Sequence, residues 1–297
     1  MTTTVLVAGS ANLDFVVRAS RIPAPGETVL GQDFRTYAGG KGANQAVACA
    51  RAGGAATRML LGLGQDAFAQ PIEASLADAG VERIVRRFDQ HATGTAFITV
   101  ADGGENAITV APGANAALQP QDLPPLAGVD LLLLQLETPL ATVSAWARAA
   151  QAAGVQVLLN AAPAQALPAE LLAAVDVLVL NEGELRALAG SAGTLDDQLQ
   201  RLAVPDVVVT LGARGCVAHT RAGHFVQPAF SVSVVDTTGA GDTFCGTLAA
   251  ALARREAWPQ ALRQASAAAA LACTQAGAQA SIPTRQQVQD LLAAPSP

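Results

Sequence analysis

A turn near the C-terminus carries the strongest chemical information in the sequence. Residues 234–246 read VVDTTGAGDTFCG, in which we expect a strand to end at Val235 and a helix to follow. Glycines at the turn permit a tight backbone path. The free N–H groups of Gly239, Ala240 and Gly241 at the head of this helix would form an anion site. Such a site can hold a phosphoryl group without a basic side chain.

Asp242 directly follows this turn. A carboxylate in the first turn of a helix is favoured by the helix dipole, so Asp242 has an ordinary reading as a helix-start residue. Beside a phosphate site, a carboxylate can also take the proton from an acceptor hydroxyl. We interpret Asp242 as this general base, and Gly239, Ala240 and Gly241 as its catalytic partners.

Lys41 is the only lysine in the sequence and lies in the glycine-rich segment AGGKGANQA. We expect it to begin an alanine-rich helix over residues 41–52, and its uniqueness favours binding over a solvated helix-start role. Asparagine is also scarce. We favour function over turn formation or capping for Asn12, Asn44 and Asn181, which fall near expected strand ends or glycine-rich turns.

The elements that must position these residues indicate an α/β protein. From residue 131 onward, short apolar strands alternate with helices, which predicts parallel strands joined by crossover helices. The strands at 131–136 and 177–180 lack period-two alternation, as expected when both faces of a sheet are covered. After a strand at 232–235, three helices are expected: 240–254, 258–273 and 286–293.

A second, smaller set of β-like pieces lies in the N-terminal half. Prolines and a glycine break one loop into pieces at 27–30 and 34–38, and residues 96–100 and 107–110 flank the turn ADGGEN as a hairpin. We expect these pieces to form a separate small sheet, a lid built from residues 15–38 and 95–111. The whole chain, residues 1–297, is then expected to be a single α/β domain.

Composition excludes several classes of protein. The chain has 297 residues, 51% hydrophobic and 14% charged, which is too apolar for a disordered chain. A net charge of −6 without a basic run argues against a partner that is nucleic acid or an anionic membrane. No apolar stretch reaches the ~20 residues of a membrane span, and no secretory signal is evident, so we expect a cytoplasmic protein. Four scattered cysteines and three histidines argue against a disulfide framework or a zinc site.

Taken together, the motifs resemble the ribokinase-like family of carbohydrate kinases. GSANLD, PAPGET, AGGKGANQAVA, GENAI, PGANA, QLETPL, NAAPA, NEGE, TLGARG, DTTGAGDTF and GAQASIP occur in that family's order. The segments around Lys41 and Asp242 match its two signature regions. The resemblance implies a three-layer α/β/α fold with a mostly parallel central sheet and a small β-sheet lid. GGKGAN, PGANA and GAQ indicate the branch that phosphorylates ribose.

The resemblance also implies roles for individual residues. It makes Asp242 the catalytic base and the amides of Gly239 to Gly241 the anion hole, which agrees with the interpretation from the residues themselves. The implied sugar contacts are Asn12, Asp14, Gly40, Lys41, Asn44 and Glu137. As alternatives, Asn12 and Asp14 could merely close an Asx turn, and Glu137 could favour the next helix N-terminus.

The segment NEGE resembles the family's Asn-x-x-Glu motif, in which Asn181 and Glu184 organise Mg²⁺ and phosphate through waters. Mg²⁺ keeps several waters, so two protein groups are an acceptable set. A helix capping box is the alternative explanation of the same motif.

Nucleotide and monovalent-cation sites are implied in the C-terminal half. The groups expected beside the adenosine of ATP are Thr210, Gly212, Gly215 and Ser266. A potassium ion is expected beside the anion hole, held by side chains and by backbone carbonyls between Ala272 and Gly277. The side chains concerned are Asp236, Thr238 and Ser281.

The implied activity is ATP-dependent phosphorylation of D-ribose at its 5-hydroxyl, by a homodimer paired through the lid sheet. Alternatives within the family are kinases of deoxyribose, fructose, ketodeoxygluconate or nucleosides. The segment GLGQDA, residues 62–67, could be read as a dinucleotide fingerprint, but it is not in the first βα unit. No P-loop motif occurs. A non-catalytic sugar sensor is disfavoured because Asp242, Asn181 and Glu184 are all present.

Overall fold

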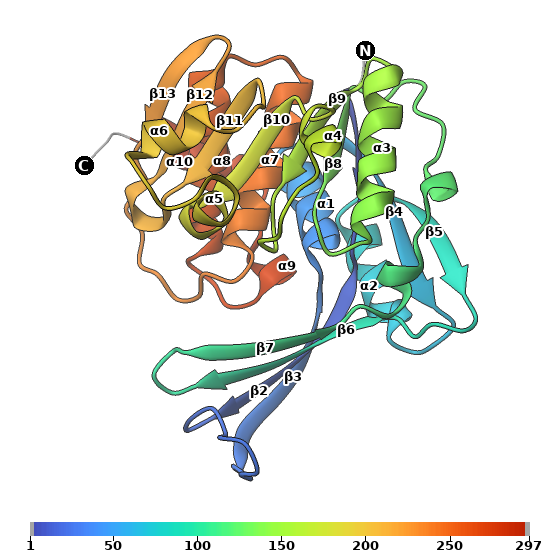
Figure 1. Cartoon of the computed structure of the whole chain (residues 1–297). Coiled ribbons are helices and arrows are strands. Elements are labelled where there is room, and N and C mark those ends of the chain that lie inside the picture. The colour runs from blue at the N-terminus through green and yellow to red at the C-terminus, as the bar shows by residue number, and fades with distance from the viewer. Residues whose placement is uncertain (1–2, 295–297) are drawn as a thin grey trace.

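A nine-stranded sheet forms the centre of the computed structural model, which describes residues 3–294 (Figure 1). Its strand order is β13-β12-β11-β10-β9-β8-β1-β4-β5, and every neighbouring pair from β11 to β5 in this order is parallel. The strands are β1 (Thr4–Ala8), β4 (Ala56–Gly64), β5 (Glu82–Phe88), β8 (Leu131–Leu134), β9 (Gln156–Asn160), β10 (Val177–Asn181), β11 (Asp206–Thr210), β12 (Cys216–Thr220) and β13 (Gly223–Gln227). The predicted mostly parallel sheet is confirmed, with β12 and β13 as an antiparallel hairpin at one edge.

Helices cover both faces of this sheet (Figure 1). Alternate residues of β1 show why: Val5 and Val7 pack on one side, and Leu6 and Ala8 on the other. One side carries α1 (Lys41–Arg51), α2 (Ala69–Asp78), α7 (Ala240–Ala253), α8 (Trp258–Ala272), α9 (Ala278–Ser281) and α10 (Arg285–Ala293). The other carries α3 (Leu140–Ala152), α4 (Ala169–Leu172), α5 (Glu182–Ala189) and α6 (Leu195–Gln200). The predicted three layers are therefore present.

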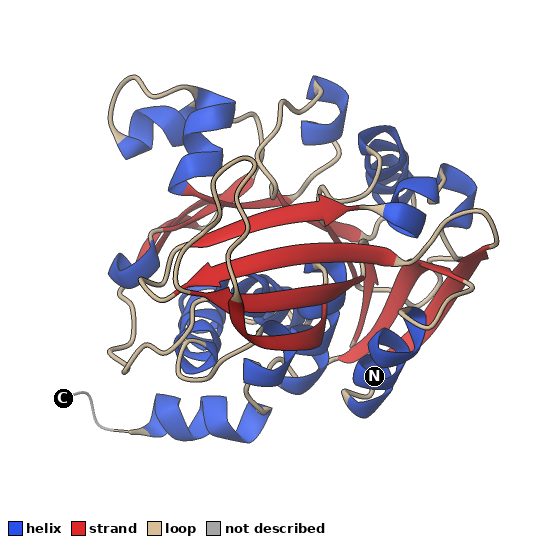
Figure 2. Cartoon of the chain, turned by 90° about the horizontal axis from the view of Figure 1, so that it is seen from below, coloured by secondary structure: helices blue, strands red, loops and turns tan. Residues whose placement is uncertain are grey.

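A four-stranded sheet projects from this body (Figure 1) and lies in front of it in the view from below (Figure 2). Its strand order is β3-β2-β6-β7. The strands are β2 (Asn12–Ala19), β3 (Gly31–Gly39), β6 (Gly94–Ala101) and β7 (Asn106–Ala111). This is the separate small sheet expected from residues 15–38 and 95–111.

Three local expectations differ from the structure. Residues 27–30 form no strand, whereas β2 begins at Asn12 and continues through the expected loop. Residues 232–235 also form no strand, although their apolar alternation suggested one. Val234 and Val235 are exposed, and the N–H of Val235 donates to the carbonyl of Cys273 at 2.8 Å. The segment pairs with no neighbouring strand, so its alternation has no sheet to fit.

The fold also bears on the dinucleotide fingerprint and on membrane-spanning segments. The glycines of GLGQDA, Gly62 and Gly64, lie inside β4, so they do not form the strand-to-helix turn of a dinucleotide site. Within residues 3–294, no helix has both the length and the apolar character that crossing a bilayer requires.

Candidate active site

The head of α7 forms the predicted anion turn. Gly239 precedes the helix with a φ of 74°, and a side chain there would come within 3.1 Å of the Cα of Ala278. Among the described residues, the N–H groups of Gly239 and Gly241 have no protein acceptor. The N–H of Ala240 donates to the carbonyl of Thr237 at 3.2 Å. Glycine is thus required at this turn, and two of the three predicted amides are available to an anion.

Asp242 lies one residue further along α7 and is held by two amide side chains. Its Oδ1 accepts from the Nε2 of Gln45 and its Oδ2 accepts from the Nδ2 of Asn44, each at 2.9 Å. Both donors come from α1, which begins directly after the glycine-rich segment. The carboxylate is buried and oriented, and its remaining lone pairs are available to accept a proton.

Gln45 connects Asp242 to the ends of the central strands. Its Nε2 also donates to the Oδ1 of Asn160 at 3.0 Å, and its Oε1 accepts from the Nε2 of Gln135 at 2.8 Å. All of these side chains are buried. Sequence reasoning missed Gln45, although it stands beside Asn44 in the segment singled out for Lys41. We interpret Gln45 as a positioning residue for Asp242.

Replacing Gln45 with Leu is therefore expected to lower kcat by about 10-fold, since one buried hydrogen bond to a charged group is worth roughly 1.5–3 kcal/mol. KM for ATP should change little, because Gln45 does not line the nucleotide pocket. Steady-state kinetics with ATP varied measure kcat and KM, and a melting curve checks that the variant folds. The matched control is Gln135→Leu, which removes a network bond and keeps the Gln45 contact with Asp242. An equal loss of kcat in both variants would contradict a positioning role.

The predicted sugar residues gather beside Asp242. The Oε2 of Glu137 accepts from the N–H of Lys41 at 3.0 Å and from the hydroxyl of Ser10 at 2.5 Å. Gly40, before α1, has a φ of 88°, and a Cβ there would lie 2.8 Å from the Cα of Ala11. This close approach brings the start of α1 against the first strand's end, where β2 begins.

Charge is concentrated in this group. Burial, then the charges of Glu137 and Asp242, raises the pKa of Asp14 to about 7. Asp242 raises the pKa of Lys41 above its usual value, burial opposes it, and Glu137 adds to the increase. The only lysine of the chain therefore sits among acidic groups and is not a solvated helix-start residue.

Asn12 is oriented by the side chain of Asn115. The Nδ2 of Asn115, in the PGANA segment, donates to the Oδ1 of Asn12 at 2.8 Å. The Oδ1 of Asn115 accepts from the N–H of Ala11 at 3.0 Å. Asn12 and Asp14 are thus the first residues of β2 and not an isolated Asx turn.

Asn181 and Glu184 form the capping box that was the alternative to a metal role. The N–H of Asn181 donates to the Oε2 of Glu184 at 2.8 Å, and the N–H of Glu184 donates to the Oδ1 of Asn181 at 2.9 Å. Burial raises the pKa of Glu184, while the bond from Asn181 and the charge of Lys41 lower it. One carboxylate oxygen remains outside the box, and this oxygen donor suits a hydrated Mg²⁺.

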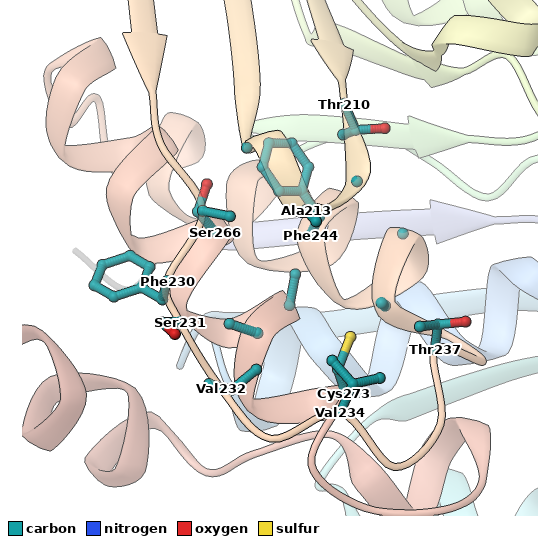
Figure 3. Close-up of a pocket in the computed structure, with 17 residues that line it drawn as sticks. Thr210, Ala213, Phe230, Ser231, Val232, Val234, Thr237, Phe244, Ser266 and Cys273 are labelled. Atoms are coloured by element: carbon teal, nitrogen blue, oxygen red, sulfur yellow. The ribbon is translucent and has the colours of Figure 1, made fainter.

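A pocket of about 520 Å³ adjoins the anion turn (Figure 3). It contains all four predicted nucleotide residues together with two residues of the turn. These are Thr210, Gly212, Gly215, Ser266, Ala240 and Gly241. Sequence reasoning missed Phe244 and a wall in a segment that it had assigned in part to a strand, formed by Phe230, Ser231, Val232 and Val234.

The predicted cation residues adjoin the same turn. The Oδ1 of Asp236 accepts from the N–H and hydroxyl of Thr238 at 2.9 and 2.7 Å, and its Oδ2 accepts from the N–H of Gly277 at 3.0 Å. Ala272 ends α8 beside Cys273, whose carbonyl accepts from the N–H groups of residues 235 and 236. Ser281 is buried at the end of α9. The available donors are oxygens, which fits a hard monovalent cation.

Comparison with known proteins agrees with this geometry. The family model "pfkB family carbohydrate kinase" matches residues 2–285. A protein named ribokinase from Haemophilus influenzae is 39% identical, with 98% of this chain and 99% of that protein covered. The ribokinase structure from Thermotoga maritima has a TM-score of 0.92 at 34% identity, covering 99% of this chain and 100% of that one.

A second similar solved structure contains bound ligands. It is the ribokinase of Arabidopsis thaliana complexed with ribose and ATP, with a TM-score of 0.90 and 34% identity over 99% of this chain and 100% of that one. The family match covers nearly the whole of the chain, and the curated relative exceeds 30% identity over almost its full length. This chain belongs to the pfkB family of carbohydrate kinases.

Proposed function

We propose that this chain is a ribokinase, which transfers the γ-phosphoryl group of ATP to the 5-hydroxyl of D-ribose. The observation that carries the proposal is the place of Asp242 between two groups of residues. On one side, Ala240 and Gly241 line the nucleotide pocket. On the other side, Asn44 contacts Asp242, and Asp14 and Lys41 are coupled to its charge. A base at this boundary can reach a hydroxyl and a terminal phosphate together.

The reaction then uses groups that are already oriented. The sugar hydroxyls are bound by hydrogen-bond donors and acceptors from Asp14, Asn12, Asn44, Lys41 and Glu137. Asp242 takes the proton of the 5-hydroxyl as the oxygen attacks the γ-phosphorus in line. The free N–H groups at the head of α7 and the helix dipole stabilise the charge on the transferring group. Mg²⁺, held through waters by Asn181 and Glu184, would neutralise phosphate charge.

A substrate panel tests this proposal. The kcat/KM values for ribose, deoxyribose, fructose, ketodeoxygluconate and a nucleoside are measured with ATP and Mg²⁺. Ribose is expected to give the highest value, because the site offers charged and amide groups to several hydroxyls. A higher value for another acceptor would overturn the sugar assignment and leave the kinase assignment. Binding of ribose without turnover would instead support a sensor.

Potassium is expected to raise kcat several-fold over a buffer free of potassium and sodium. The ion would lie between Asp236, Thr238, Ser281 and the carbonyls between Ala272 and Gly277, where it would fix the shape of the anion turn. Initial rates at constant ionic strength measure the effect. Asp236→Asn should weaken the potassium dependence. Equal rates of the unmodified chain in both buffers would show that the proposed potassium site is absent.

We propose that the small sheet acts as a lid over the sugar and also pairs two copies of the chain. Phe15 stacks between Phe34 and Phe97, with centroid distances of 6.2 and 5.3 Å, and Phe34 and Phe97 are more than half exposed. Because alternate strand residues point to opposite faces, this aromatic strip lies on the face away from Asp14. An exposed strip of this kind favours a homodimer, which light scattering of the purified chain tests.

We further propose that residues 1–297 work as a single domain with its lid, in the cytoplasm. The four cysteines, all among the described residues, are free thiols, and Cys49, Cys216 and Cys245 are buried. Free thiols in this number are typical of a reducing compartment.

A further inference from the structure

Two of the chain's three histidines meet an aspartate at the edge of the central sheet. His219 on β12 and His224 on β13 are directly opposite in the hairpin, with ring centroids 4.5 Å apart. Asp196, near the start of α6, has its Oδ1 3.2 Å from the Nε2 of His219. One ligand atom from each of the three residues lies within 4.8 Å of the others. Figure 1 shows α6 beside β12 and β13, far along the sheet from the lid.

These three groups are a ligand set for a transition metal. Imidazole nitrogen is a ligand of Zn²⁺, Cu²⁺ and Ni²⁺, and a carboxylate oxygen commonly completes the set. Metal–ligand distances of about 2.0–2.2 Å place the ligands of a tetrahedral ion about 3.3 Å apart. The Asp196 to His219 separation already has this value, and one ligand atom of His224 lies within 4.8 Å of both. Three protein ligands leave one position for water.

The surroundings leave room for an ion and do not oppose its charge. Both histidines line a hollow of about 240 Å³ beside the apolar residues Leu199 and Leu202. Arg221, in the turn between the two strands, is engaged by the Oδ2 of Asp206 at 3.0 Å. The scattered cysteines and few histidines of the sequence do not predict a metal site, because it depends on the register of a hairpin that sequence reasoning missed.

We propose that Asp196, His219 and His224 form a binding site for one divalent transition-metal ion of the zinc and copper class. The ion joins α6 to the β12–β13 hairpin. β13 ends at Gln227, and the chain then continues into a wall of the nucleotide pocket formed by Phe230, Ser231, Val232 and Val234. The ion therefore braces the edge of the sheet from which this wall extends, and takes no part in the phosphoryl transfer.

Calorimetric titration of the chelator-treated full chain with Zn²⁺ tests the proposal. We expect one ion per chain, and binding at least about 10- to 100-fold weaker in the double variant His219→Ala/His224→Ala, since loss of even an outer-shell partner costs this much. Zn²⁺ should also raise the Tm of the wild-type chain and leave that of the double variant unchanged. His91→Ala, the third histidine and an exposed one, is the matched control and should bind as wild type.

Binding of Cu²⁺ identifies the ligand atoms spectroscopically. Electron paramagnetic resonance of the Cu²⁺-loaded chain should show coupling to two imidazole nitrogens, and the double variant should lose it. Kinase activity of each variant in chelator-treated buffer with Mg²⁺ reports folding, because none of the three residues lies in the active site. If the double variant does not fold, Asp196→Asn, at an exposed position, tests the same set. Equal Zn²⁺ affinity in wild type and variant, or no saturable binding by wild type, overturns the proposal.

Discussion

Replacing Asp242 with Asn is expected to lower kcat by at least about 10²-fold, the usual contribution of a general base, with the fold intact. The variant amide cannot accept the proton of the attacking hydroxyl. It does keep the shape of the carboxylate, and its new N–H group has a possible acceptor. The Oδ1 of Asn44 is buried and has no partner among the described residues, so rotation of that amide satisfies the new donor. The loss should therefore appear in the chemical step.

Rapid-quench measurement of a single turnover separates this step from substrate binding. The matched control is Asp290→Asn, an exposed aspartate on α10, which should keep the wild-type rate and Tm. Ribose and ATP binding by calorimetry should be retained in the Asp242 variant. A single-turnover rate near that of wild type would remove Asp242 as the base and, with it, the proposed mechanism.

The parts of the fold that were predicted correctly are those in which sequence and environment agree. Leu131–Leu134 and Val177–Leu180 are buried on both faces, as expected for apolar runs of strand length in a central parallel sheet. β5, β13 and its neighbour β12 were missed because strands at or next to a sheet edge face solvent on part of their surface, and these three carry arginines, histidines and a glutamine. Residues 232–235 have the opposite character: they look like a strand but pair with no strand, and Val232 and Val234 line a pocket instead.

The residues of the active site were likewise predictable only where their type or backbone conformation sets them apart in the sequence. Asp242, Lys41 and the glycines of the anion turn stand out because their type is rare or because only glycine fits the backbone. The sequence alone assigns no role to Gln45, Gln135 and Asn160, and their importance comes from meeting in a buried network between α1 and the ends of β8 and β9. Segments far apart in the chain must fold together before this network exists. The His219 and His224 pair depends in the same way on hairpin register.

Replacing Asp14 with Asn is expected to lower kcat/KM for ribose by about 10²-fold, because two charge-assisted hydrogen bonds to sugar hydroxyls are each worth roughly 1.5–3 kcal/mol. The effect should fall mainly on KM for the sugar, since Asp14 is on the sugar side of Asp242 and does not line the nucleotide pocket. Steady-state kinetics with each substrate varied in turn measure this. Asp33→Asn, on the exposed part of β3, is the control and should change neither parameter. A change in KM for ATP alone would contradict the sugar-binding role.

The pKa of Asp14, raised to about 7 first by burial and then by Glu137 and Asp242, gives this residue a pH dependence of its own. Below pH 7 the group is protonated and loses the charge that accepts sugar hydroxyls, so its contribution to kcat/KM for ribose should fall as pH decreases from 8 to 6. The Asn variant should lack this contribution.

The stability of the protein depends on the ionisation of Asp14 in the opposite direction. An acidic group whose pKa is higher in the folded than in the unfolded state makes the folded protein less stable as pH rises from about 4 to about 7. Above pH 7 the ionised Asp14 therefore destabilises the free protein by roughly 2 to 4 kcal/mol, so the Asn variant should melt at a higher temperature than wild type at pH 8 and at nearly the same temperature at pH 4. Melting curves at the two pH values decide the matter: a wild-type chain that is the more stable of the two at pH 8 would show that the carboxylate of Asp14 is not held in a desolvated, acid-lined site.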